Sequence, residues 1–225
     1  MDERDISAIA GDGDGSPLVS SREKRTEIII VAILSFAALA TAWSGYQASL
    51  WDGIQSSNYT QASGSRTNAA QQRTEANQFR LADLSIFEAY IGATIEENEA
   101  IADFYFDRFR DEFRLAYDAW IALDPLNNPD APASPLGMPD YQVAQDAEAD
   151  RLEARADQLF ADGEEANNIS DIYTLTTLLF AAVLFFAAIS ERFEYFRAQV
   201  ILLVVAGIGL VIGLVIAGGQ PITTG

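Results

Sequence analysis

Three long apolar segments constrain the fold of this chain more than any other feature. They span residues 28–48, 172–190 and 198–217, and none of them contains Asp, Glu, Lys or Arg. An α-helix needs about 20 apolar residues to cross the roughly 30 Å hydrocarbon core of a bilayer. The sequence therefore predicts an integral membrane protein with three transmembrane helices.

The segment between the first two apolar runs carries most of the charge. Residues 49–171 contain 24 Asp and Glu against 8 Arg, and the 225-residue chain has a formal net charge of −19 with a single lysine, Lys24. An acidic, lysine-poor surface is typical of proteins from high-salt habitats, where salt screens self-repulsion. An ordinary acidic ectodomain is the alternative. Because either surface repels polyanions, we expect no nucleic-acid partner.

Basic residues beside the apolar runs predict the orientation in the membrane. Arg22, Lys24 and Arg25 precede the first run, and Arg192 and Arg197 lie between the second and third. The other ends of the runs have no adjacent Lys or Arg. Since Lys and Arg concentrate in cytoplasmic loops, the N-terminus and the last hairpin are predicted to be cytoplasmic. The acidic segment and the C-terminus are then outside, in a multi-pass protein of the plasma membrane.

These features predict an all-α fold, with three transmembrane helices and an external helical bundle between the first and second. The expected segments are a disordered cytoplasmic tail (1–26), transmembrane helix 1 (27–48), an acidic extracytoplasmic helical domain (49–171) with a proline-rich loop (124–139), transmembrane helix 2 (172–190), a cytoplasmic hairpin (191–197), transmembrane helix 3 (198–217) and an external tail (218–225).

Two N-terminal patterns have alternative interpretations. Ala40-Thr41-Ala42 follows a basic stretch and an apolar core, as a signal-peptidase site does, so cleavage that removes residues 1–42 is an alternative to an anchor. The long acidic leader and the continuing apolar run favour the anchor. Asp12 and Asp14 lie between glycines as in a calcium loop, but the later EF-hand positions are wrong.

The external domain is predicted to contain amphipathic helices. Residues 49–80 have few apolar positions and are expected to continue the first span as helix, with bends at glycines. Residues 81–123 show a helical apolar stripe, and residues 140–162 are expected to form a returning helix that Gly163 and Asn167-Asn168 interrupt. Helical residues 49–123 would extend about 110 Å, but 140–170 would return only about 45 Å. We therefore expect a bend near Gly64 or Gly92.

Several residues are candidates for packing, partner contact or modification. Small residues four apart let helices approach closely, either within one protomer or in a homo-oligomer. They are Gly207, Gly209, Gly213 and Ala217 in the third span and Ala38 and Ala42 in the first. The aromatic residues Phe106, Phe109, Phe113 and Trp120 are expected to form the core of the bundle, with an exposed partner face as the alternative. Asn58 and Asn168 begin glycosylation sequons on the predicted outer side.

The residue types argue against an enzyme active site or a metal site. The chain has no Cys and no His, which removes thiolate ligands, the commonest general base and the commonest transition-metal ligand. The apolar runs contain no ionisable residue, although ion pathways usually have one. Carboxylate pairs such as Glu96 and Glu97 are expected to form a solvated helix face. We predict no catalytic residue, no metal, no cofactor and no enzyme activity.

Two motifs resemble a group of uncharacterised prokaryotic membrane proteins that have one span, an external helical domain and two closing spans. The motifs are AWSGYQASLW at residues 42–51 and LLFAAVLFFAAISERF at residues 178–193. The resemblance implies the same layout and carries no activity. With the lipid bilayer as its environment, the protein is expected to be an envelope scaffold or an accessory subunit that contacts a protein partner or a second copy. A sensory or transport-associated protein whose external domain binds a ligand is the alternative.

Overall fold

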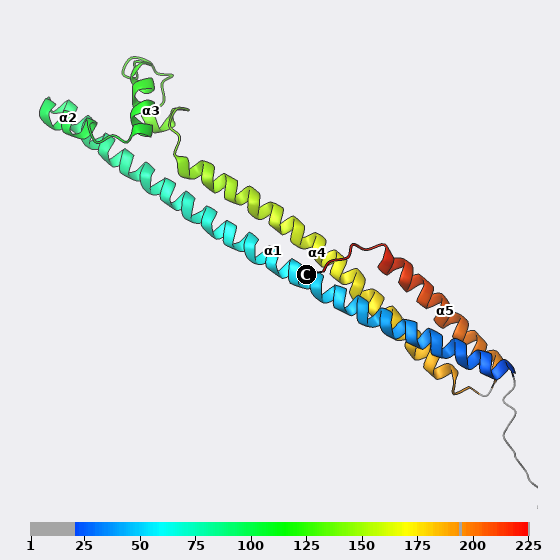
Figure 1. Cartoon of the computed structure of the whole chain (residues 1–225). Helices are drawn as coiled ribbons and strands as arrows, with labels where there is room; N and C mark the ends of the chain where they lie inside the picture. The colour runs from blue at the N-terminus through cyan, green and yellow to red at the C-terminus, as the bar shows by residue number, and fades with distance from the viewer. Residues whose placement is uncertain (1–20, 194, 225) are drawn as a thin grey trace, which may run out of the picture. The chain divides into compact units, whose positions relative to one another are not determined.

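The computed structural model describes residues 21–193 and 195–224, and this part of the chain is helical without strands. The elements in Figure 1 are α1 (Ser21–Ile95), α2 (Glu99–Phe106), α3 (Asp111–Ile121), the 3₁₀ turn η1 (Pro135–Gly137), α4 (Ala144–Ser190) and α5 (Phe196–Gly218). Two compact units share them. The membrane unit comprises the chain up to Trp51 and from Ile169 onwards, and the hairpin unit comprises Asp52–Asn168.

Three helices are long and apolar enough to cross a membrane, namely α1, α4 and α5. Large apolar side chains are exposed in these helices, for example Leu39 at 71% and Val215 at 70%, as expected of residues that face lipid. Over the described residues the predicted all-α fold is thus confirmed, with three helices that are long and apolar enough to span a membrane. Because α1 begins at Ser21, residues 21–26 of the predicted tail are helical. Residues 1–20, with the glycine-flanked Asp12 and Asp14, lie outside the described residues.

Small residues bring α1, α4 and α5 together in the membrane unit. Ala37 of α1, Val183 and Ala187 of α4 and Ala206 of α5 form a buried cluster. A Cβ added at Gly213 would lie 2.4 Å from Cε1 of Phe180, so α5 can approach α4 this closely only with glycine at that position.

The segment after α5 is attached to α1 and α4. The Gln47 side chain makes two hydrogen bonds with the Thr223 backbone: Nε2 donates to the carbonyl at 3.0 Å, and Oε1 accepts from the N–H at 3.1 Å. Trp51 Nε1 and Tyr173 OH both donate to the Pro221 carbonyl at 3.2 Å. Two polar residues of the AWSGYQASLW motif therefore bind the C-terminal segment.

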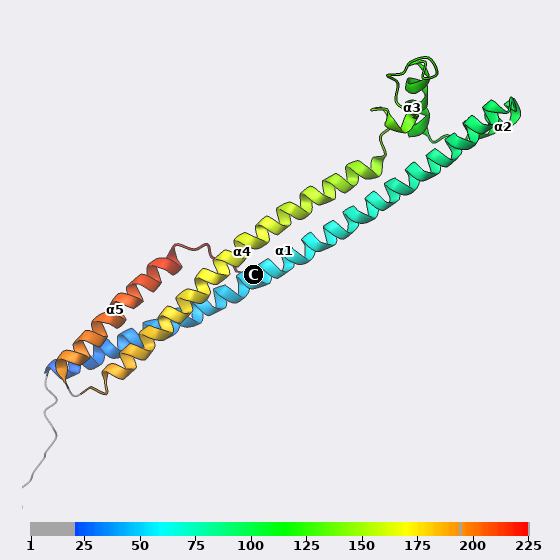
Figure 2. The ribbon, with the colours of Figure 1, turned by 180° about the vertical axis from the view of Figure 1, so that it is seen from behind.

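The hairpin unit is built on an antiparallel pair, α1 and α4, which run side by side in opposite views (Figure 1 and Figure 2). Small buried residues recur every seven positions on both helices. They are Ala62, Ala69 and Ala76 on α1 and Ala149, Ala156 and Gly163 on α4. We call this contact the alanine seam. A seven-residue repeat keeps one face of each helix toward its partner over several turns.

A ladder of ion pairs flanks the alanine seam. Arg66 binds Asp157 at 3.2 Å, Arg73 binds both Asp150 and Glu153 at 2.8 Å, and Arg80 binds Asp146. The three arginines are also seven residues apart, and their partners follow in reverse order along α4. The Arg73 contacts raise the pKa of its guanidinium and lower the pKa of Glu153. Exposed pairs of this kind add little stability individually, but together they select one register.

The predicted interruption of the returning helix is wrong, because α4 continues through Gly163 and Asn167-Asn168. A Cβ at Gly163 would lie 2.5 Å from Cε1 of Tyr59, whose ring stacks on Phe160 with centroids 5.2 Å apart. Asn167 accepts a hydrogen bond from Gln55 at 2.8 Å. Gly163 and Asn167 thus contact α1 from within a continuous helix, and they do not interrupt it. Gly64 likewise lies within α1, where no bend separates two helices.

The end of the hairpin is a cap formed by the end of α1, α2, α3 and the proline-rich loop. Phe87, Phe109, Phe113, Tyr117 and Trp120 form its buried core. Trp120 Nε1 donates to the Pro132 carbonyl at 2.7 Å, which attaches the loop to α3. The stripe over residues 81–123 thus belongs to three helices rather than one, since the chain turns at Glu97 and again before Asp111.

We predict opposite effects of alanine at two helical glycines of the hairpin unit. Gly64→Ala meets nothing within 4 Å and should stabilise the protein by about 0.5–1 kcal/mol, because glycine weakens a helix interior. Gly163→Ala places a methyl group against Tyr59 and should destabilise by about 1–3 kcal/mol, as overpacking does. Thermal unfolding in detergent, followed by circular dichroism, measures both. Equal effects of the two substitutions would contradict the close contact at Gly163.

Candidate functional site

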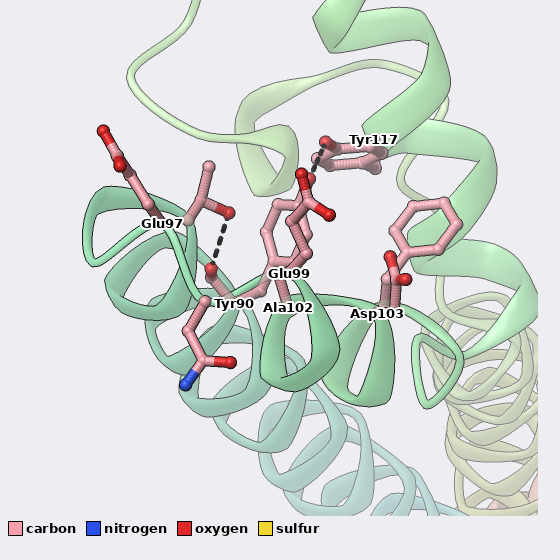
Figure 3. Close-up of a pocket in the computed structure, with 9 residues that line it drawn as sticks. Tyr90, Glu97, Glu99, Ala102, Asp103 and Tyr117 are labelled. Carbon is pink, nitrogen blue, oxygen red and sulfur yellow. Dashed lines mark hydrogen bonds between the residues drawn. The ribbon is translucent and has the colours of Figure 1, made fainter.

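A groove opens in the cap where the chain turns from α1 into α2. Its volume is about 820 Å³, within the range of roughly 300–1,000 Å³ found for ligand pockets. Figure 3 shows the nine residues that line it. They are Tyr90 and Thr94 of α1, Glu97 and Asn98 of the turn, Glu99, Ala102, Asp103 and Phe106 of α2, and Tyr117 of α3.

Three aromatic rings form the inner wall of the groove. The Tyr90 and Tyr117 hydroxyls are hydrogen-bonded at 2.8 Å, and the Phe106 centroid lies 6.0 Å from that of Tyr90 and 5.6 Å from that of Tyr117. Burial, and then the hydrogen bond with Tyr90, raise the pKa of Tyr117. Its hydroxyl therefore stays protonated and serves as a hydrogen-bonding group rather than as a base.

Three acidic residues, Glu97, Glu99 and Asp103, are among the lining residues at the rim. Glu99 and Asp103 are four residues apart on α2 and so share one face of the helix. Figure 3 shows both on the side of Tyr90 and Tyr117, whereas the Glu97 side chain extends away from them. Asn98 begins α2, and its side chain accepts from the Ile101 N–H. Glu97 adopts a positive φ of 58°, a conformation that non-glycine residues seldom take.

The groove is negatively charged without an internal counter-ion. None of the nine lining residues is Lys or Arg. Within residues 21–193 and 195–224, the carboxylates of Glu97, Glu99 and Asp103 make no ion pair. The arginines of the ladder are paired with carboxylates of α4 instead. Arg114 contacts the wall from outside the lining: its guanidinium lies 4.7 Å from the Phe106 ring centroid, and its Nη2 donates to the Phe106 carbonyl at 2.7 Å.

A second polar feature connects the cap to the start of α4. Asp83 of α1 is 1% exposed, and its Oδ2 accepts from Arg110 Nη1 at 3.1 Å and from Tyr141 OH at 2.7 Å. Desolvation raises the pKa of Asp83, while the hydrogen bonds from Tyr141 and Arg110 oppose this shift. Oδ1 is buried without a protein partner among the described residues. The carboxylate ties three segments of the hairpin unit together and does not line the groove.

The aromatic residues singled out from the sequence divide between two roles. Phe109, Phe113 and Trp120 lie in the cap core, where their burial leaves no exposed partner face. Phe106 is half-buried and lines the groove. Sequence reasoning missed the groove, because it treats carboxylates such as Glu96 and Glu97 as a solvated helix face. The available sequence signal was Asn98 followed by Glu99, because Asn is a preferred N-cap residue and so marks the start of a helix here.

The small residues of the spans fall into two groups, those that contact another helix of the protomer closely and those that do not. Gly209 and Gly213 contact α4 within the protomer, at distances that leave no room for a Cβ. Gly207 has open space at its Cβ position, and Ala38 and Ala42 are exposed. Ala217 is partly buried. Their use between protomers stays a prediction.

Both glycosylation sequons lie inside long helices. Asn58 is in α1 and Asn168 is in α4, whereas used acceptors favour surface loops. Ser170 of the second sequon is buried, and its hydroxyl donates to the Ala48 carbonyl at 2.9 Å. This serine therefore has a structural contact of its own.

No known protein family matches the chain, and no curated protein and no solved structure is significantly similar to it. The described residues contain no group of three or more His, Cys, Asp or Glu arranged to hold a metal. Aromatic walls, a neutral hydroxyl pair and an acidic rim are suited to binding.

Proposed function

We propose that this chain is a non-enzymatic membrane protein that acts as an envelope scaffold or as an accessory subunit of a membrane complex. Three helices anchor it, and the hairpin unit presents the cap to a protein partner. Large apolar side chains left exposed in the cap carry the proposal. They are Ile95, Ile101, Phe104, Leu115, Ile121, Leu123 and Leu126.

The exposed apolar residues are concentrated in one part of the hairpin unit. Seven of them fall within residues 95–126, outside the three apolar runs, so lipid does not account for their exposure. Single exposed apolar residues are ordinary on protein surfaces. Their concentration in one segment of an otherwise acidic unit favours contact with a partner.

We propose that the N-terminus and the α4–α5 hairpin are cytoplasmic and that the hairpin unit and the C-terminus are outside the plasma membrane. The distribution of Lys and Arg supports this orientation. The hydrogen bonds of Gln47 and Trp51 with the C-terminal segment support only one part of this topology, since they require residues near 50 and near 222 to lie on the same side of the membrane.

Cysteine labelling tests this orientation directly, because the chain has no cysteine of its own. Leu126→Cys, at a side chain that is 94% exposed, should react with a membrane-impermeant maleimide in intact cells. Phe193→Cys, in the predicted cytoplasmic hairpin, should react only after the cells are opened. Labelling of Phe193→Cys but not Leu126→Cys in intact cells would reverse the proposed orientation.

Purification in mild detergent tests the interaction. We expect a stoichiometric partner, or a second copy, whose presence light scattering and mass spectrometry establish. The double substitution Leu115→Ser/Leu126→Ser should weaken the affinity for this partner at least about tenfold, because a leucine buried in the interface contributes roughly 1.5–3 kcal/mol.

Leu81→Ser is the control, because Leu81 is as exposed as Leu115, at 66%, but lies on α1 before the cap. It should leave the complex intact. A protomer that purifies alone from gently solubilised membranes, or a complex that the cap substitutions leave unchanged, would refute the interaction through the cap.

The groove favours a second candidate, a sensory or transport-associated protein. Its lining residues Tyr90 and Thr94 belong to α1, which also contains the first apolar run. A ligand that altered the end of α1 would act on a helix that continues toward the membrane. In this candidate, ligand binding should raise the Tm of the purified protein.

A further inference from the structure

The cap groove joins an aromatic wall and an acidic rim, which is the chemistry that recognises organic cations. We propose that it binds a compact organic cation, an ammonium or a guanidinium, between the Tyr90, Phe106 and Tyr117 rings and the carboxylates of Glu99 and Asp103. The inference goes beyond the proposed function. The protein could lack a partner at the cap and still bind such a cation.

The aromatic wall supplies the first part of the argument. A cation within about 6 Å of a ring centroid is attracted by the negative face of the ring. The cap already makes such contacts with its own arginines: Arg108 lies 3.4 Å from the Phe104 centroid, and Arg114 lies 4.7 Å from that of Phe106. The neutral Tyr90–Tyr117 hydroxyl pair adds hydrogen-bonding groups without adding charge.

Charge supplies the second part. Some acidic residues of the hairpin unit, such as Asp83, Asp150 and Asp157, are paired with arginines of the chain. The groove places Glu99 and Asp103 beside a volume of about 820 Å³, with no Lys or Arg among its lining residues. A cation that enters the groove would therefore meet negative charge that no lining residue offsets. A bare metal ion would not use the aromatic wall, whereas an organic cation uses both features.

Isothermal titration of the full-length protein in an uncharged detergent tests the proposal, with choline, spermidine and N-acetyl-arginine amide as probes. We expect saturable binding of at least one of them. The neutral carbon isostere of choline, 3,3-dimethyl-1-butanol, should bind at least about tenfold more weakly. Preference for the arginine amide would identify a side chain of a partner protein as the natural source, and preference for choline or spermidine a free amine.

Two double substitutions separate the groove from the general acidity of the surface. Glu99→Gln/Asp103→Asn removes two rim charges and should weaken binding at least about tenfold. Glu96→Gln/Asp107→Asn makes the same change at exposed neighbours that do not line the groove, and should change the affinity by less than about twofold. All four positions are exposed, so circular dichroism should show an unchanged fold.

Three results would overturn the proposal. One is the absence of saturable binding for all three cations. Another is equal affinity for choline and its neutral isostere, which would make the groove a plain apolar site. The third is equal weakening by the two double substitutions, which would mean that the acidic surface attracts cations without a site.

Discussion

The alanine seam between α1 and α4 is the contact on which the rest of the hairpin unit depends. Residues as small as Ala69 and Ala156 let the two helices lie close together over several turns, and both are fully buried, at 1% and 0% exposure. Each alanine buries little apolar surface, so stability must come from the length of the contact. The arginine ladder and the Gly163–Tyr59 contact then select a single register among those that the repeat permits.

The cap follows from this register. Arg80 binds Asp146 at the beginning of α4, so the fifteen residues of α1 that follow, up to Ile95, extend past the start of the returning helix. Their apolar side chains, including Phe87 and Tyr90, need other partners. α2, α3 and the proline-rich loop supply them, and the groove lies where α2 meets the end of α1. A long outgoing helix and a shorter return thus explain why this unit has a cap.

The sequence alone predicts the spans well because length and apolarity are local properties that lipid demands of any crossing helix. The seam escaped prediction because alanine scores as weakly apolar, although residues 62, 69 and 76 are evenly spaced. Gly163 and Asn167 look like helix breakers in isolation. In the structure both are helical and contact Tyr59 and Gln55, which lie more than a hundred residues away in sequence. The turn at Glu97, with its positive φ, and the groove beside it depend on tertiary packing in the same way.

Cross-linking across the seam tests the register most directly, using double-cysteine variants of the cysteine-free chain in membranes. The account predicts that Arg73→Cys/Asp150→Cys and Arg66→Cys/Asp157→Cys, which replace residues in contact at 2.8 and 3.2 Å, are joined by a short bis-maleimide. Arg66→Cys/Asp146→Cys, about 16 Å out of register at 1.5 Å per residue, should not be joined. Efficient cross-linking of that mismatched pair, or none in the matched pairs, would contradict the antiparallel alanine seam.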